Sequence, residues 1–182
     1  MGSEPSIKTE RLLLRPATMD DAQALFSVYS DPLVMREIVE GPRDWQGTLR
    51  RLHHIVEHQE RYGFSRWAVV ERRTGTVIGH AGIQCWPELP HPELAYTLGR
   101  QWWGKGYATE AARAWLDYSF RELGLARVML LVTPTNLASI RVAEKIGMHR
   151  VKETHHDGHR FLMFEIASVA PSASQQRLRR KP

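Results

Sequence analysis

Two glycines that flank a lysine, Gly104, Lys105 and Gly106, form the segment of this sequence best suited to chemistry. They lie between an expected strand at residues 93–98 and a helix expected to begin near Tyr107. At such a junction the first N–H groups of the helix have no partner within it, and the helix dipole favours negative charge. Glycine lets the backbone approach a ligand closely, and the lysine adds a cation. The segment suits a diphosphate; the alternative is a plain glycine-rich turn.

The cysteine and histidine residues give weaker indications of a functional site. Cys85 is the single cysteine, so neither an internal disulfide nor a thiolate metal cage can form, and no base lies beside it in the sequence. His54 and His58 have the spacing of one helix face, and residues 155–159 contain three further histidines. These patterns are more typical of a solvated helix face and a hairpin tip than of a metal site, so we expect no metal.

The hydrophobic patterning predicts an α+β fold with about seven strands and about four helices. Residues 127–132 (RVMLLV) form a continuous apolar run, typical of a strand buried on both faces. Residues 32–43, which contain two prolines and a glycine, are expected to be a loop. The expected strands are 8–16, 65–71, 77–86, 93–98, 127–132, 149–154 and 159–166, and the expected helices are 18–30, 44–61, 107–123 and 136–146.

Length and composition indicate one domain: the chain has 182 residues, of which 42% are hydrophobic and 25% charged. We expect this domain at residues 8–166, between a flexible N-terminus at 1–7 and a basic, disordered tail at 167–182. The tail contains four basic residues and no acid, so the net charge of +5 leaves the rest of the chain nearly neutral.

This charge distribution makes nucleic acid an unlikely partner, because the domain lacks a basic patch interleaved with aromatic residues. No apolar run approaches the roughly 20 residues of a membrane-spanning helix, so no membrane partner is expected. The N-terminus has no basic and apolar leader pattern, and the expected location is therefore cytoplasmic.

Two motifs in order resemble one known family. Residues 101–106 (QWWGKG) are similar to the Gln/Arg-x-x-Gly-x-Gly/Ala signature of the GCN5-related N-acetyltransferases, the GNAT superfamily, and residues 136–147 (NLASIRVAEKIG) resemble its later Asn- and Ser-containing helix. Residues 9–16 and 31–36 resemble the RimJ/RimL branch. The resemblance covers roughly the whole expected domain. It implies a mixed, mostly antiparallel central sheet flanked by helices.

The resemblance also implies a cosubstrate, acetyl-CoA. The amides of residues 100–108, with Thr109, are expected to line its pyrophosphate, the backbone of Leu98 to contact the pantetheine or acetyl group, and Asn136 to reach the pantetheine arm. The cofactor-binding residues implied in this way are Leu98, Arg100, Gln101, Gly104, Lys105, Gly106, Tyr107, Ala108, Thr109, Asn136 and Lys145.

Catalysis in this family needs a base for the amine and an acid for the leaving thiolate. Glu93 matches a glutamate that serves as general base in several relatives, and Glu153 is the second candidate, followed by Tyr96 and His155. Many members have a tyrosine in the second motif as the acid, but this sequence has none there. Ser139 is therefore the expected substitute, although a serine that only satisfies the helix start is the alternative.

The function that follows from the resemblance is acetyl transfer from acetyl-CoA to a primary amine by direct attack in a ternary complex. The acceptor is either a protein N-terminus, as in the RimJ/RimL branch, or a small amine, and the protein is expected to be a monomer or homodimer. A catalytically idle module that binds acyl-CoA is the alternative from another class. The presence of both Glu93 and Ser139 argues weakly against that alternative.

Overall fold

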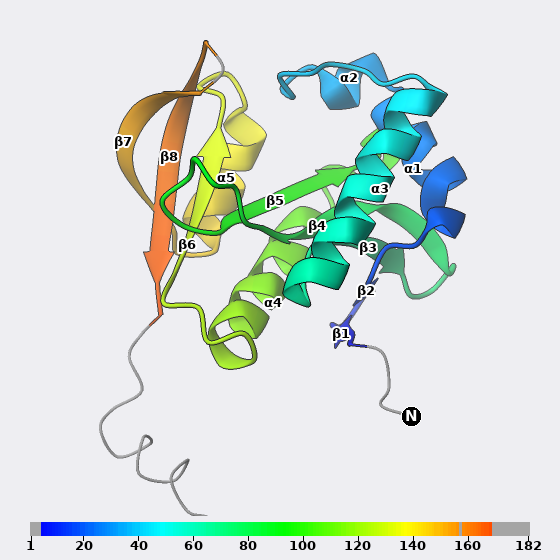
Figure 1. Cartoon of the computed structure of the whole chain (residues 1–182), viewed down its shortest axis with the longest axis horizontal. Helices are drawn as coiled ribbons and strands as arrows, with labels where there is room; N and C mark the ends of the chain where they lie inside the picture. The colour runs from blue at the N-terminus through cyan, green and yellow to red at the C-terminus, as the bar shows by residue number, and fades with distance from the viewer. Residues whose placement is uncertain (1–4, 157, 169–182) are drawn as a thin grey trace, which may run out of the picture.

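The computed structural model describes residues 5–156 and 158–168, so most of both expected terminal segments lies outside it. One eight-stranded sheet has the strand order β1-β2-β3-β4-β5-β6-β8-β7, and every neighbouring pair is antiparallel except β5 and β6 (Figure 1). The strands are β1 (Ile7–Lys8), β2 (Leu12–Arg15), β3 (Arg66–Glu71), β4 (Thr76–Gln84), β5 (Glu93–Leu98), β6 (Arg127–Val132), β7 (His149–His156) and β8 (His159–Ala167).

The α+β class and the mostly antiparallel sheet are confirmed, with one strand more than expected. The predicted strand at 8–16 is divided into β1 and β2 by a turn in which the N–H of Thr9 donates to the carbonyl of Leu12 at 2.9 Å. The sheet also extends one residue beyond each end of the expected domain range, to Ile7 and Ala167.

Within the described residues, five α-helices flank the sheet: α1 (Ala22–Tyr29), α2 (Pro32–Met35), α3 (Trp45–Tyr62), α4 (Tyr107–Arg121) and α5 (Leu137–Lys145), with 3-10 turns η1 (Met19–Asp21) and η2 (Arg100–Trp102). The expectation of a loop throughout 32–43 was wrong, because α2 begins there. The Oδ1 of Asp31 accepts a hydrogen bond from the N–H of Leu33 at 2.9 Å, and Pro32 occupies the first helical position. An Asp-Pro pair begins a helix as readily as it ends one.

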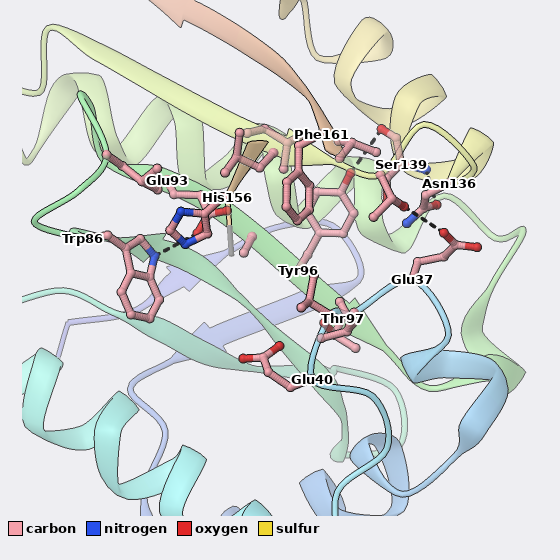
Figure 2. A pocket seen from close by; sticks show the side chains of 18 of the residues that line it. Glu37, Glu40, Trp86, Glu93, Tyr96, Thr97, Asn136, Ser139, His156 and Phe161 are labelled. Atoms are coloured by element: carbon pink, nitrogen blue, oxygen red, sulfur yellow. Dashed lines mark hydrogen bonds between the residues drawn. The ribbon is translucent and has the colours of Figure 1, made fainter. Parts of the chain in front are cut away.

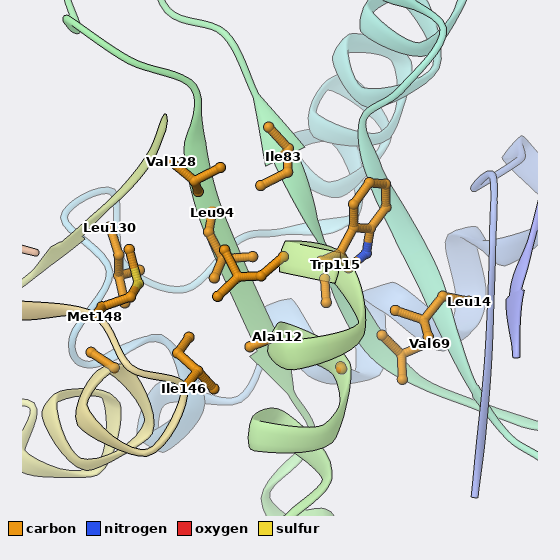
Figure 3. Close-up of a cluster of buried hydrophobic side chains, with 14 of the residues drawn as sticks. Leu14, Val69, Ile83, Leu94, Ala112, Trp115, Val128, Leu130, Ile146 and Met148 are labelled. Carbon is orange, nitrogen blue, oxygen red and sulfur yellow. The ribbon is translucent and has the colours of Figure 1, made fainter. Parts of the chain in front are cut away.

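Two hydrophobic clusters hold the helices on opposite faces of the sheet. On one face, Trp115 and Ala112 of α4 pack against strand residues that include Ile83 and Leu94, as Figure 3 shows. On the other face, α1 and α3 contribute a second cluster that includes Ala68 of β3. Trp115, Ile83 and Leu94 have no more than 1% of their surface exposed, so the centre of the sheet is a rigid support for its edges.

The parallel pair β5 and β6 separates almost at once. In the described chain one residue pair, Glu93 with Met129, is in register between them, whereas β4 and β5 pair over six residues. Figure 1 shows the two strands diverging from that point. The later residues of β5 therefore present backbone groups toward a gap in the sheet, and Glu93 lies where the gap closes.

Candidate active site

A cavity of about 310 Å³ lies beside the gap between β5 and β6. Its walls come from the segment after α2, from α3, from β3, β5 and β6, and from the start of α5. Three of the expected site residues, Glu93, Asn136 and Ser139, line it together (Figure 2). Its other polar and charged lining side chains are Glu37, Glu40, Arg51, Arg66, Trp86, Glu88, Tyr96, Thr97, Thr133 and His156.

Glu93 is held by two donors on the same oxygen. Its Oε2 accepts from the indole Nε1 of Trp86 at 2.9 Å and from Nη2 of Arg66 at 3.3 Å. Its Oε1 accepts no hydrogen bond within the described chain. Glu93 is in register with Gln84, so its side chain is on the sheet face that α1 and α3 cover. One carboxylate oxygen is thereby fixed, and the other is able to accept a proton from a ligand.

Asn136 and Ser139 begin α5 and share one hydrogen bond. The Oδ1 of Asn136 accepts from the N–H of Ser139 at 3.0 Å, which caps the helix and leaves the Nδ2 of Asn136 as a donor. The side chain of Ser139 shares a hydrogen bond with the hydroxyl of Tyr96. The hydroxyl of Ser139 therefore lies beside that of Tyr96 at the wall of the cavity, where both can face a ligand.

Tyr96 contributes a second hydroxyl at the same place. Its Oη donates to the carbonyl oxygen of Ser139 at 3.4 Å (Figure 2). Burial raises the pKa of Tyr96 to about 12, so the hydroxyl keeps its proton at neutral pH. Tyr96 thus suits proton donation better than the role of base considered from the sequence. No local pattern predicts this contact, because it joins residues 43 positions apart.

The glycine loop has the backbone that its sequence requires. Gly104 and Gly106 have φ values of +72° and +82°, a region that other residues rarely adopt. Gly106 precedes α4 with no side-chain cap, and the N–H of Glu110 donates to its carbonyl at 3.0 Å. The N–H groups of the first turn of α4 therefore face outward with the positive end of the helix dipole. An anion fits this place.

Arg11 supports the loop from the N-terminal strands. Its Nη1 donates to the carbonyl of Lys105 at 2.8 Å, its Nε donates to Glu110 at 2.7 Å, and its guanidinium carbon lies 4.4 Å from the ring centroid of Tyr107. Three groups around the loop are thus held by one side chain, a role with no counterpart in the sequence motif.

The remaining expected cofactor residues do not line the cavity. The carbonyl of Leu98 accepts from the indole of Trp103 at 2.8 Å, and Arg100 pairs with Asp31 at 3.4 Å. Gln101 and Lys105 are exposed, and Ala108 and Thr109 are partly buried in the first turn of α4. Lys145 is exposed at the end of α5 opposite to Asn136.

The other two candidates for the base lie on β7 and do not line the cavity. Glu153 is exposed and forms ion pairs with Arg150 at 2.6 Å and Arg160 at 3.5 Å. His155 is also exposed, whereas the adjacent His156 lines the cavity.

The expectation that His54 and His58 share a solvated face was wrong for His58, which is 6% exposed. Its Nδ1 donates to the carbonyl of Phe64 at 2.8 Å, and its Nε2 accepts from the N–H of Cys85 at 3.0 Å. Neither the described histidines nor the described acidic residues form a group of three that could hold a metal ion. None of the described helices has the length and apolarity to cross a membrane.

Comparison with known proteins adds independent information. Residues 11–149 match the family model described as an acetyltransferase (GNAT) domain. The protein YkkB of Bacillus subtilis is 39% identical over 155 residues, which are 84% of this chain and 90% of YkkB. YnaD of the same organism, named an N-acetyltransferase, is 33% identical over 79% of this chain and 82% of its own length. An acetyltransferase structure from Agrobacterium tumefaciens has a TM-score of 0.81 at 32% identity and covers 92% of this chain and 97% of its own.

Proposed function

The chain belongs to the GNAT family of acetyltransferases, and from this premise we propose that it transfers the acetyl group of acetyl-CoA to a primary amine within a ternary complex. The observation that carries the proposal is the convergence of Glu93, Ser139 and Tyr96 on one cavity beside the gap between β5 and β6. A carboxylate oxygen that accepts no hydrogen bond from the described residues, the Oε1 of Glu93, and two hydroxyls are the groups that the reaction needs.

Acetyl-CoA fits the surroundings of this cavity. The pyrophosphate suits the outward N–H groups at Gly106 and the first turn of α4. The pantetheine arm suits the gap, where backbone groups of β5 and the Nδ2 of Asn136 can donate or accept. Support comes from RimL, a ribosomal L7/L12 acetyltransferase solved with coenzyme A, which shares the fold with a TM-score of 0.77 at 16% identity.

The proposed chemistry needs no covalent enzyme intermediate. The lone pair of the neutral amine attacks the thioester carbonyl, the C–S bond breaks, and the amide and the thiol of coenzyme A are formed. Glu93 accepts the proton from the amine, directly or through water, at its Oε1. Ser139 or Tyr96 gives a proton or a hydrogen bond to the departing sulfur. Holding the amine and thioester together supplies much of the acceleration. The pKa of Cys85 is raised by burial, which disfavours a cysteine nucleophile.

The finer assignments are also proposals. We place the protein in the RimJ/RimL-like branch on the motifs at 9–16 and 31–36. We also propose a cytoplasmic location and a monomeric or homodimeric state. Named relatives differ in their acceptors: the spermidine N(1)-acetyltransferase of Escherichia coli is 28% identical over 150 residues. A small amine and a protein N-terminus therefore both need to be tested.

The direct experiment measures thiol release from acetyl-CoA with a panel of small amines and peptides, alongside calorimetry of coenzyme A binding. Release that depends on the acceptor and is lost in the Glu93→Gln variant supports the proposal. Tight binding of coenzyme A without turnover of any amine would instead establish an idle acyl-CoA module.

A further inference from the structure

Arg51 of α3 is a cation of the cavity without an anionic partner. Its Nη2 donates to the Oε1 of Gln84 at 3.2 Å, and its guanidinium carbon lies 5.9 Å from the ring centroid of Trp86. No carboxylate in the described chain lies within ion-pair distance of it. Burial, followed by the positive charge of Arg66, lowers the pKa of Arg51 to about 9, and the nearby Tyr29 and Glu40 offset only part of this shift. A partly buried guanidinium in this position is costly unless a ligand balances it.

The neighbouring charges do not supply that balance. Arg43 pairs with Glu40 at 3.2 Å, and Arg66 pairs with Glu93 at 3.3 Å. The guanidinium groups of Arg43, Arg51 and Arg66 therefore share two carboxylates. Arg51 is the one that forms no ion pair with either of them.

The other two carboxylates of the cavity are held elsewhere on its wall. Glu37 accepts from the hydroxyls of Thr133 and Thr135 at 2.8 and 2.6 Å, and it also pairs with Arg36 at 3.2 Å. Glu88 lies 3.8 Å from the imidazole of His156 and is half exposed. Neither is positioned to neutralise Arg51.

Buried donors near Arg51 also lack acceptors. The Nε2 of Gln84, whose side chain is fully buried, and the Nε of Arg66 have no hydrogen-bond partner among the described residues. Arg66 is in register with Gly82, two positions before Gln84, so Arg66 and Gln84 share the sheet face on which Glu93 also lies. Such orphaned donors indicate that an acceptor is missing from the cluster.

We propose that Arg51, with Arg66 and Gln84, binds a carboxylate of the acceptor, which is therefore a small amine of the amino-acid type. This inference rests on the proposed acetyl transfer. Arg51 binds Gln84, and Gln84 is in register with Glu93, so the amine beside Glu93 and the carboxylate beside Arg51 are separated by the few bonds of a small molecule. With the carboxylate bound, Arg51, Arg66, Glu93 and the ligand carry no net charge.

The first test compares matched acceptors: amino acids such as phenylalanine, their carboxamides, and the amines that lack the group, such as phenethylamine. We expect kcat/KM to be at least about ten-fold higher for the carboxylated acceptor. The carboxamide has the less basic amine, so intrinsic reactivity at neutral pH favours the opposite order. Equal or faster turnover of the carboxamides across the panel would overturn the inference and leave the acetyl transfer intact.

The second test uses Arg51→Gln, with Arg51→Lys as the variant that keeps the charge. Arg51→Gln is expected to lower kcat/KM for the carboxylated acceptor about ten-fold or more, with little change for the carboxamide or in the KM of acetyl-CoA. Arg51→Lys restores part of the loss. Arg50→Gln, an exposed neighbour on the same helix, is the matched control and leaves all values unchanged. A uniform loss for both acceptors would mean that Arg51 acts only structurally.

If the protein turns over no amine, that result counts against the proposed acetyl transfer alone. The carboxylate subsite is then tested by measuring ligand binding. Calorimetry then measures a panel of N-acetyl amino acids, and their methylamides, against the complex with coenzyme A. Binding of the acids that is lost in Arg51→Gln supports the carboxylate subsite. No binding by any acid, or equal binding by the methylamides, refutes it.

Discussion

The hydroxyl of Tyr96 donates to the carbonyl oxygen of Ser139 across a distance of 3.4 Å and joins β5 to the first turn of α5. The contact bridges the gap that opens after Glu93 and Met129. Two hydroxyls, those of Tyr96 and Ser139, therefore lie at one point on the wall of the cavity. Mutating each residue alone distinguishes the contributions of the two hydroxyls.

Tyr96→Phe is expected to lower kcat by about ten-fold or more with little change in the dissociation constant of acetyl-CoA, because the proton donor is lost and the ring is kept. Ser139→Ala should have a smaller effect where water replaces its hydroxyl. Steady-state rates and calorimetry measure both quantities, and Tyr62→Phe on the exposed end of α3 is the control. A larger loss for Ser139→Ala would assign the donor to Ser139.

Glu93→Gln is expected to reduce kcat by about 10²-fold, because the amide keeps the shape of the side chain and cannot accept the proton. The acidic limb of the pH–rate profile should change at the same time, while acetyl-CoA affinity stays near the wild-type value. Glu153→Gln, on the exposed face of β7, is the comparison. If Glu153→Gln is the slower variant, the base belongs to the final hairpin; if neither matters, the enzyme positions amines that are already neutral.

Gly106→Val tests the anion-binding loop. Gly106 has φ of +82°, and an added Cβ would meet only the Nη2 of Arg11 at 3.4 Å, so the fold should survive while the side chain blocks approach to the amides. Gly124→Val has a comparable φ of +66° with nothing near its Cβ, and it shares the backbone strain of about 1–2 kcal/mol. Calorimetry should show weakened acetyl-CoA binding for Gly106→Val alone. Equal affinities in the two folded variants would move the pyrophosphate site elsewhere.

Glu110→Gln tests how the N-terminal strands support this loop. Glu110 accepts from the hydroxyl of Thr9 at 2.6 Å and from the N–H and Nε of Arg11 at 2.9 and 2.7 Å. We expect the amide to loosen Arg11 from Lys105 and to weaken acetyl-CoA binding several-fold, with Glu122→Gln, later in the chain and outside these bonds, as the control. Unchanged affinity in Glu110→Gln would show that the loop keeps its conformation without this support.

Local patterns predicted those elements whose signals are strong. The alternation at Glu93–Leu98 and the apolar run at Arg127–Val132 gave the bounds of β5 and β6, and Gly147, with φ of +84°, follows α5 as a helix-ending glycine. The short helix α2 was missed because four residues are too few to show a helical period. The residues at its start, Asp31 and Pro32, are also a pair that can either begin or end a helix.

The candidate site was harder to predict from the sequence than the helices and strands. Glu93, Asn136 and Ser139 were found through a family resemblance, and their convergence depends on the separation of β5 from β6, which no local pattern encodes. Arg51 and Arg66 carry no motif at all. Arg51 reaches Gln84 because α3 crosses the sheet face on which β3 and β4 place Arg66 and Gln84, and such long-range contacts follow only from the tertiary structure.

His58 of α3 links the segment before β3 to the segment after β4 through two hydrogen bonds that depend on its charge. Its Nδ1 donates to the carbonyl of Phe64, and its Nε2 accepts from the N–H of Cys85, so the neutral imidazole satisfies both partners. Protonation would remove the acceptor. Burial is the main cause that lowers the pKa of His58 below its ordinary value near 6.5.

The stability of the protein should therefore fall as the pH is lowered through about 6.5. Below that value the unfolded chain binds a proton at His58 that the folded chain still excludes, and the stability continues to fall until the lower folded pKa is reached. His80, buried beside Tyr29 with its pKa well below 6.5, adds to the same trend. His58→Gln can keep both hydrogen bonds without titrating, so it should reduce the slope between pH 5 and pH 7 in urea unfolding, whereas exposed His53→Gln should not. An identical slope in wild type and His58→Gln would show that His58 is not a source of the pH dependence.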